Sequence, residues 1–343
     1  MTSAGSGGVW FPAVQVGTGV DKYTERLVLA LNKRGVRAEI TWLPKRAEYF
    51  PFSVSVPEAP SWASLVHVNS WLHSRFIPDN LPLVVTVHSC VHDPMLIPYK
   101  SCAQSWYHQL WVKRCEALSI RKATAVTAVS AYTATMTEHI FDTSGIKTIY
   151  NWVDTEAFPE RKTVTKCKSK PFRVLCIGSL NKRKGSDLLP AIMRELGEGF
   201  ELRVTGNLHD WGNISDIAHR VKNIGYLRSV ADLVHEYHSN DVLLFPTRLE
   251  GFGLVAVEAM SCGLPVVASN CSSLPEVVGP DMPELLCEVD DVVGFARAIR
   301  NLRDSNGLYE RSVKIGRKRV LNKFSEERAV NSYIELYQSL GYF

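Results

Sequence analysis

The 343 residues of this chain exceed what one hydrophobic core usually organises and suit two domains of about 150 residues each. With 45% hydrophobic and 22% charged residues, the composition excludes a mainly disordered chain. The formal net charge of +4 excludes a polyanion-binding block, so no nucleic-acid partner is expected. No uncharged apolar run approaches the roughly 18 residues that a membrane-spanning helix needs.

The cysteines and the first residues predict where the protein works. The lead before residue 9 is rich in Gly and Ser and lacks the basic start of a signal peptide. The cysteines form no Cys-x-x-Cys pair and no zinc-ligand spacing, and several lie in apolar runs. Buried, reduced thiols are therefore expected. The predicted location is the cytoplasm, with peripheral attachment at the inner face of the membrane as a further option.

Apolar runs alternate with amphipathic stretches along the chain, which is the pattern of doubly wound α/β sheets. In the first half, a helix is predicted over 20–34, and strands are predicted at 9–16, 36–42, 65–69, 83–88, 125–129 and 147–151. The second half repeats the pattern, with strands predicted at 172–177, 201–204, 242–245 and 265–268.

A polar, basic segment bounded by prolines, residues 159–171, predicts a linker between two domains. We therefore expect an N-terminal Rossmann-like domain over 1–158 and a C-terminal one over 172–325. Ligands bind at the carboxyl ends of the strands in such sheets, so a central cleft facing both domains is expected.

The most informative segment, residues 241–270, joins an apolar strand to a helix through the run Glu250-Gly-Phe-Gly253. The glycines allow close backbone approach to a ligand, and amides at the helix start favour anionic oxygens. Glu250 precedes the helix and Glu258 lies within it, at most roughly 12 Å away at the helical rise per residue. Two surface carboxylates would show the same spacing, but this span also suits a sugar nucleotide held at both ends.

The run from Glu250 through Glu258 to Met260 resembles the E-x7-E signature of the retaining glycosyltransferases of family 4, which have the GT-B fold. The resemblance covers nearly the whole chain and is thinnest over 41–83. It implies that Glu250 faces donor-sugar hydroxyls, that the amides of Phe252, Gly253 and Leu254 hold sugar and phosphate, and that Glu258 binds the ribose. It also implies that a C-terminal helix, about 326–343, packs back on the first domain.

A second anion-binding element follows the strand at 172–177: Gly178, then Lys182-Arg-Lys184 and Gly185. Basic side chains on such a loop can supply countercharge to a diphosphate, although a basic loop alone is also typical of a solvated turn. The family usually has Gly-Arg-Leu at this point, and here Ser179 stands in the arginine's place. The phosphate charge must then come from Arg183 and Lys184.

The first domain and the base-binding region offer further matches. Gly19 ends a glycine-rich loop that resembles the family's diphosphate loop, but Asp21 stands where glycine is common, which argues against tight phosphate packing. His88, at the end of the strand at 83–88, resembles the family's histidine near the donor sugar; a histidine satisfied by packing is the alternative. Tyr226 matches the region whose backbone reads the base.

One helical stripe carries a different signal. Its members lie close to Arg121 and Lys122, and they are Tyr107, Leu110, Trp111 and Leu118. Core packing is the plainer interpretation, and contact with anionic lipid or a lipid-linked acceptor is the alternative.

These features predict a retaining glycosyltransferase of the hexosyltransferase type. It would move a sugar from a nucleoside-diphosphate donor, with UDP or GDP favoured, to a glycan or lipid-linked saccharide in surface polysaccharide, lipopolysaccharide or glycolipid biosynthesis. No metal or other cofactor is expected, because cationic side chains and helix amides would neutralise the leaving diphosphate.

The predicted residues fall into two groups. The catalytic group is His88, Glu250 and Lys184. The donor-binding group is Gly19, Gly178, Arg183, Lys184, Tyr226, Phe252, Gly253, Leu254 and Glu258. Three alternatives stay open: a sugar-nucleotide epimerase of the same fold, a phosphorylase, and a catalytically silent donor-binding partner subunit.

Overall fold

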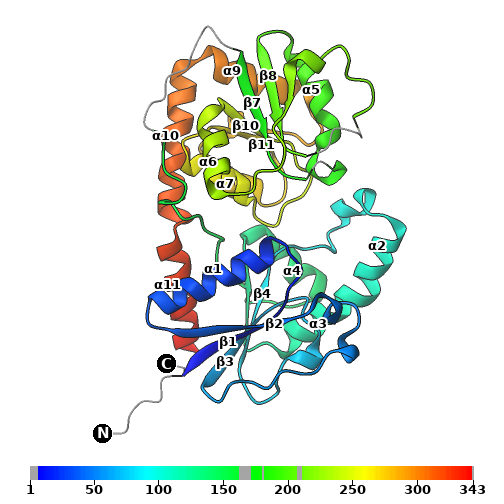
Figure 1. Cartoon of the computed structure of the whole chain (residues 1–343), viewed down its shortest axis with the longest axis vertical. Helices are drawn as coiled ribbons and strands as arrows, with labels where there is room; N and C mark the ends of the chain where they lie inside the picture. Colours follow the sequence, from blue (N-terminus) through cyan, green and yellow to red (C-terminus); the bar gives the residue numbers. More distant parts are fainter. Residues whose placement is uncertain (1–6, 162–170, 180, 207–210, 342–343) are drawn as a thin grey trace. The chain divides into compact units, whose positions relative to one another are not determined.

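The computed structural model describes residues 7–161, 171–179, 181–206 and 211–341. The chain divides into two compact units, which we call unit 1 (1–150 and 326–343) and unit 2 (151–325) (Figure 1). Most of the predicted linker, including Cys167, lies outside the described residues, as do the first six residues and the last two.

Unit 1 is built on a six-stranded sheet whose neighbouring strands all pair in parallel. Its order across the sheet is β2 (Arg37–Leu43), β1 (Gly8–Val14), β3 (Ala63–Asn69), β4 (Leu83–Val87), β5 (Ala125–Ala128) and β6 (Lys147–Thr148). All five residues of β4 are buried, as expected for a central strand covered on both faces. The order reverses between β1 and β3, so this is the switch point of the sheet.

Among its described residues, unit 1 has four helices in the connections between its strands, and a fifth, α11, comes from the end of the chain. They are α1 (Gly19–Lys33), α2 (Cys102–Tyr107), α3 (Lys113–Lys122), α4 (Ala131–Phe141) and α11 (Glu326–Ser339). A π turn, η5 (His108–Val112), joins α2 to α3, and the short 3-10 turns are η1 (Lys45–Ala47), η2 (Pro51–Ser53), η3 (Ser74–Phe76) and η4 (Pro94–Tyr99). Figure 1 shows α11, from the end of the chain, packed beside α1.

Unit 2 repeats the parallel arrangement in a different order. Its six strands run β12 (Leu286–Cys287), β11 (Val266–Ser269), β10 (Val242–Phe245), β7 (Phe172–Cys176), β8 (Phe200–Val204) and β9 (Val221–Asn223). Read from β9, this is the Rossmann order, and its switch point lies between the first and fourth strands, β7 and β10. Four fully buried residues of β10 and its neighbours β7 and β11 (Val174, Val242, Leu244 and Val267) belong to the core.

The helices of unit 2 are α5 (Leu189–Leu196), α6 (Val230–Ser239), α7 (Leu254–Ser261), α8 (Leu274–Val278), α9 (Val292–Asp304) and α10 (Asn306–Lys323). Its 3-10 turns are η6 (Lys182–Lys184), η7 (Ser186–Leu188), η9 (Ala218–Arg220) and η10 (Pro283–Leu285). Two parallel doubly wound sheets confirm the predicted fold class. The cleft expected between them concerns how the units are placed and stays a prediction.

Candidate active site

The two motifs singled out in the second half of the sequence follow the two strands at the switch point of unit 2. Gly178 and the η6 turn come after β7, and the run from Pro246 to Gly253 comes after β10. Because β7 and β10 pair in parallel, their carboxyl ends lie at the same edge of the sheet. The topology therefore brings together two loops that are more than sixty positions apart, at the place where such sheets bind ligands.

Lys184 and Glu250 form the centre of this region. The Lys184 ammonium makes an ion pair with Oε1 of Glu250, and the Thr247 hydroxyl donates to the same oxygen at 3.1 Å. The Glu250 amide in turn donates to Oγ of Ser272 at 2.9 Å. Glu250 is only 8% exposed, so the lysine offsets the cost of holding this carboxylate away from water.

Arg183, next to Lys184 in the η6 turn, approaches the same carboxylate. Its Nη1 atom lies 3.9 Å from Oε1 of Glu250 and donates to the Leu249 carbonyl at 2.9 Å. The side chains of Arg183 and Lys184 are 37% and 23% exposed, so each keeps a solvent-facing part. Two cations thus flank one buried carboxylate. The predicted pair Arg183 and Lys184 converges on the predicted Glu250.

The η6 turn that carries these cations is fixed by packing and by a cap. The Asn181 side chain accepts from the Lys184 amide at 3.0 Å, and Gly185 ends the turn at φ +70°. A Cβ atom on Gly185 would lie 2.0 Å from the carbonyl oxygen of Pro246, so only glycine allows this approach of η6 to the loop after β10.

Arg248 holds the same turn in place, and no sequence motif pointed to this residue. Its guanidinium donates to the Lys182 carbonyl, to both Asp187 oxygens at 2.7 and 3.0 Å, and to Asp290 at 2.7 Å. The Asp187 and Asp290 carboxylates raise the pKa of this almost buried guanidinium, against the opposing effect of its burial. Asp290 therefore supports the basic turn through Arg248.

The α7 helix begins at the motif glycine. Gly253 caps it at φ +96°, and the Ser273 hydroxyl donates to the carbonyls of Glu250 and Phe252 at 3.1 and 3.0 Å. Phe252 is buried against Phe324, with ring centroids 5.3 Å apart. This packing orients the start of α7. Leu254, the first residue of this helix, is half-buried.

Glu258 occupies the second turn of α7, as predicted, and has a partner that the sequence did not reveal. The buried Tyr237 hydroxyl donates to Oε2 of Glu258 at 2.8 Å. Burial and the neighbouring carboxylate raise the pKa of Tyr237 well above its usual value, so the phenol keeps its proton. Tyr237 therefore holds one oxygen of Glu258 in place.

The remaining donor-binding candidates of unit 2 lie on exposed or half-exposed loops. The Gly178 amide donates to Oγ of Thr205 at 2.9 Å, with the glycine at φ +129°. Ser179, in the position of the family's arginine, accepts from the Asn181 side chain at 3.1 Å. Tyr226 is 79% exposed after the turn at Gly225, which leaves its ring open to a ligand.

In unit 1, His88 follows β4 and contacts the Tyr23 ring edge-on, with centroids 4.6 Å apart. Burial lowers the pKa of His88 to about 4, so its imidazole is neutral at pH 7. His88, Tyr23, His67 and Thr86 border a cavity of about 10 Å³, room for about one water molecule.

The glycine-rich loop before α1 is held by its own carboxylate. Oδ2 of Asp21 accepts from the amides of Val16 and Gly17 at 2.9 and 2.7 Å. Gly19 begins α1, and no atom lies within 4 Å of a Cβ placed there. The Asp21 carboxylate accepts from amides that a phosphate could otherwise use. This contact agrees with the expectation from sequence that Asp21 argues against tight phosphate packing.

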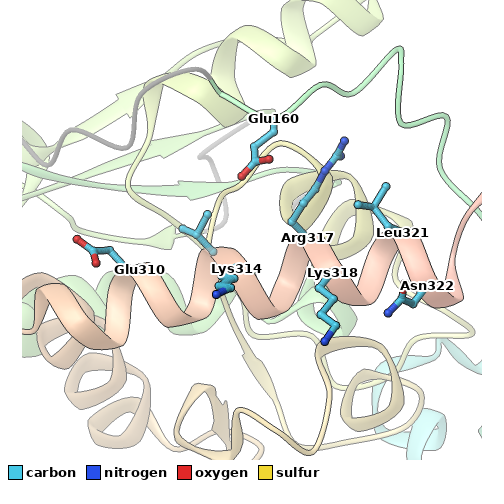
Figure 2. A pocket seen from close by; sticks show the side chains of 8 residues that line it. Glu160, Glu310, Lys314, Arg317, Lys318, Leu321 and Asn322 are labelled. Atoms are coloured by element: carbon cyan, nitrogen blue, oxygen red, sulfur yellow. The ribbon is translucent and has the colours of Figure 1, made fainter.

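A cavity of about 330 Å³ in unit 2 is lined by none of these residues. Figure 2 shows most of its lining side chains extending from α10, with Glu160 contributed by a segment outside that helix. Arg317 donates to the Ser261 carbonyl and hydroxyl at 2.6 Å, so this cavity lies by the last residue of α7 rather than its first. Phe252, Gly253 and Leu254 lie at the opposite end of that helix.

Among the described residues, no group of three or more His, Cys, Asp or Glu side chains is arranged to hold a metal ion. A search of the same residues finds no helix with the length and apolar character needed to cross a bilayer.

Comparison with known proteins identifies two family models in this chain. Residues 41–157 match the model described as Glycosyltransferase Family 4, and residues 171–305 match the one described as Glycosyl transferases group 1. An uncharacterized 41.2 kDa protein in the cps region of Klebsiella pneumoniae is 30% identical over 57% of this chain and 55% of its own length. The chain thus spans little more than half of that relative.

Another relative is the lipopolysaccharide core biosynthesis mannosyltransferase LpsB of Rhizobium meliloti, which is 27% identical over 78% of this chain and 79% of its own. Among solved structures, sucrose-phosphate synthase from Thermosynechococcus elongatus matches with a TM-score of 0.77 at 20% identity, over 97% of this chain and 99% of that one. Anabaena HepE in complex with UDP and glucose matches with a TM-score of 0.71 at 17% identity, over 96% and 99%.

Proposed function

Since this chain is a glycosyltransferase that belongs to family 4 and has the GT-B fold, we propose that it moves a hexose from a nucleoside-diphosphate sugar to a hydroxyl of a saccharide acceptor, with retention at the anomeric carbon. The observation that carries the proposal is the convergence of Lys184 and Arg183 on Glu250 beside the start of α7. It supplies positive charge, a sugar-binding carboxylate and a helix N-terminus in one place.

The donor would lie along this edge of unit 2. Its diphosphate would take the amides at the start of α7 and the charge of Arg183 and Lys184, because these groups favour anionic oxygens. Glu250 would accept from hydroxyls of the donor sugar, and Glu258, held by Tyr237, from the ribose. Gly178 and Tyr226 would lie along the donor, with Tyr226 near the base.

The reaction breaks the bond between the anomeric carbon and the β-phosphate oxygen and forms one from that carbon to the acceptor oxygen, on the same face. The acceptor's proton passes to the departing phosphate oxygen, and a nucleoside diphosphate leaves. Negative charge grows on that phosphate as the bond breaks, so Lys184 and Arg183 help most in the transition state. Their presence is our reason for proposing a reaction without a divalent metal.

His88 would act in its neutral form. An imidazole with a pKa of about 4 carries no charge at pH 7 and can donate one hydrogen bond to a sugar hydroxyl while accepting another. Its place after β4, at the carboxyl edge of the unit 1 sheet, supports this role.

The names of two relatives support the acceptor and donor classes that we propose. LpsB is a lipopolysaccharide core mannosyltransferase, and HepE was solved with UDP and glucose. We propose an acceptor in surface polysaccharide, lipopolysaccharide or glycolipid assembly, a UDP- or GDP-sugar donor, and a cytoplasmic site of action with peripheral contact to the membrane. Gly19 would contact the donor or the acceptor at its uncrowded Cα, and its loop would not bind a phosphate through backbone amides.

The test combines donor binding with turnover. UDP-, GDP-, ADP- and CDP-sugars are screened by thermal shift, since a ligand of the native state raises the unfolding temperature. The donor that binds is then incubated with and without EDTA, and released nucleoside diphosphate is measured. We expect slow hydrolysis that EDTA does not change. Binding without hydrolysis or transfer would indicate a silent partner, an epimerised sugar an epimerase, and activity that returns only with Mg²⁺ or Mn²⁺ a metal-dependent reaction.

A further inference from the structure

The most exposed large apolar side chains of unit 1 lie in two segments. Phe50 and Phe52, around η2, are 69% and 76% exposed, and Trp106 and Leu110, on α2 and η5, are 68% and 64% exposed. Aromatic rings of this size are normally buried, so their display on one unit calls for a partner. Figure 1 shows α2 at the periphery of unit 1.

Side-chain contacts hold these two segments against each other. The Tyr49 and Tyr107 rings have centroids 5.5 Å apart, and the Trp111 indole donates to the Glu48 carbonyl at 2.9 Å. His73 stacks on Trp111 at 5.5 Å and meets Phe52 edge-on at 5.7 Å. The four exposed side chains therefore lie on two segments that these contacts hold together, and we infer that they form one surface.

This surface corrects the stripe predicted from the sequence. Tyr107 and Trp111 face the loop at Glu48 and fasten it to the helix. Of the predicted stripe, Leu110 and Leu118 are exposed, at 64% and 37%. Trp106, one turn before Leu110, is 68% exposed, and the sequence analysis did not single it out. Trp106 and Leu110 therefore form an exposed stripe that shares Leu110 with the predicted one.

The charge around the exposed stripe has one sign. Lys113 and Arg114 follow Leu110 by three and four residues, directly after the π turn, with Arg114 exposed and Lys113 half-buried. Between Asp93 and Glu116 the chain has no acidic residue, while it contains Lys100 as well as these two cations.

The loop segment adds positive charge to the same surface. Lys45 and Arg46 are exposed just before it, and the Arg75 guanidinium lies 5.3 Å from the centre of the Phe52 ring. The one acidic residue within residues 45–54, Glu48, is half-buried and accepts from the Tyr107 hydroxyl at 3.2 Å. Apolar rings bordered by cations match the interfacial region of an anionic bilayer.

We propose that Phe50, Phe52, Trp106, Leu110, Lys113 and Arg114, the aromatic–basic face, dock unit 1 on a membrane surface that contains anionic lipid. The rings enter the headgroup region, and the cations bind lipid phosphates. Both contributions are needed, because neither apolar insertion nor charge attraction alone gives firm attachment. This inference deepens the proposed function, since it presents the enzyme to a lipid-linked acceptor.

The experiment is co-sedimentation of the full chain with vesicles of phosphatidylcholine alone and with 30% phosphatidylglycerol, a composition of about one anionic lipid in three. We expect binding to the anionic vesicles only, weakened by salt because exposed charges are screened. Trp106→Ser and Phe52→Ser should each weaken binding by about tenfold, in proportion to the apolar area withdrawn from the lipid. The reversal Arg114→Glu should weaken it by at least as much.

Leu29→Ser is the matched control, because Leu29 is 57% exposed on α1, outside the aromatic–basic face. It should bind like the wild type. Equal binding to both vesicle types, no binding, or unchanged binding of all three face variants would overturn the proposal. So would a dimer in light scattering that Trp106→Ser dissociates, since a second copy would then cover the face.

Donor binding separates this inference from the proposed function. Nucleoside diphosphate titrations and donor hydrolysis, both without vesicles, should be the same in the wild type and the face variants. A wild-type chain that hydrolyses its donor but does not bind the anionic vesicles would reject the membrane-docking proposal alone. Vesicle binding by a chain that neither binds nor hydrolyses any donor would reject the proposed function alone.

Discussion

Lys184 illustrates how one side chain can serve two purposes at the site. Its ammonium neutralises Glu250, a carboxylate that is 8% exposed. A donor phosphate would share the same cation. The sequence predicted both residues from separate motifs, but their contact joins positions 66 apart and depends on the pairing of β7 with β10, which no local pattern encodes.

The first prediction concerns Lys184→Ala. Losing a charge-assisted contact to phosphate costs about 1.5–3 kcal/mol, or roughly 10- to 150-fold in nucleoside diphosphate affinity. The ratio kcat/KM should fall further, because the charge on the phosphate grows in the transition state. Calorimetric titration and steady-state kinetics measure the two effects. Lys182→Ala is the control, since Lys182 is exposed on the same turn and should matter less. Wild-type values for Lys184→Ala would remove the lysine from the site.

The second prediction concerns the Glu258–Tyr237 pair. Glu258→Ala should weaken nucleoside diphosphate binding by roughly 10- to 150-fold, because a charge-assisted hydrogen bond to a hydroxyl is lost. Tyr237→Phe removes only the bond that orients Oε2, so it should weaken binding less. Glu310→Ala, an exposed glutamate of the same unit, is the control. If Glu258→Ala binds as tightly as the control, the ribose role is wrong.

At the scale of elements, two residues determine the position of the basic turn η6. Gly185 lets it approach the carbonyl of Pro246, and Arg248 holds it through the Lys182 carbonyl, Asp187 and Asp290. The order of strand, glycine, basic loop and helix was readable from sequence because each part has its own local pattern. The role of Arg248 could not be read from the sequence, because its partner Asp290 is 42 positions away.

The third prediction follows from the space beside Gly185. Gly185→Ala places a Cβ 2.0 Å from a backbone oxygen at φ +70°, so η6 must move away from the loop after β10. Strain of this kind costs about 1–3 kcal/mol, and the shifted turn should carry Lys184 away from Glu250. Thermal unfolding and donor titration should both report the loss. Gly307→Ala is the control, because no atom lies within 4 Å of its Cβ and its φ is not positive. Unchanged donor affinity in Gly185→Ala would separate η6 from donor binding.

At the scale of the whole molecule, the alternation of apolar and amphipathic runs was enough to predict two parallel sheets. The central strands were predicted within a few residues because each is a continuous buried run. The edge strands β9 and β12 were missed, since they have only three and two residues and β9 is partly exposed. A short edge strand has too few residues for a clear hydrophobic pattern, and its pairing depends on the neighbouring strand.

The buried polar network of unit 1 also escaped sequence reasoning. His67 on β3 bonds to the Tyr337 hydroxyl through Nδ1 and to Oγ1 of Thr86 through Nε2, both at 2.7 Å. Tyr333, on the same helix as Tyr337, meets the Tyr23 hydroxyl at 2.5 Å. The network joins α11 to strands almost three hundred positions earlier, and its members look like isolated polar residues in the sequence.

The last prediction is that this network makes unit 1 sensitive to acid. Burial lowers the pKa of His67 from 6.5 to about 3, so below pH 6.5 the unfolded chain takes up a proton that the folded chain does not. The stabilisation is complete above pH 6.5 and is lost as the pH falls, by about 2 kcal/mol at pH 5. Hydrogen exchange of β4 and α11 amides at pH 7 and pH 5, corrected for intrinsic rates, measures it. His67→Gln should reduce the difference between the two pH values, whereas the exposed His139→Gln should leave it unchanged. Equal pH dependence in both variants would mean that another group titrates.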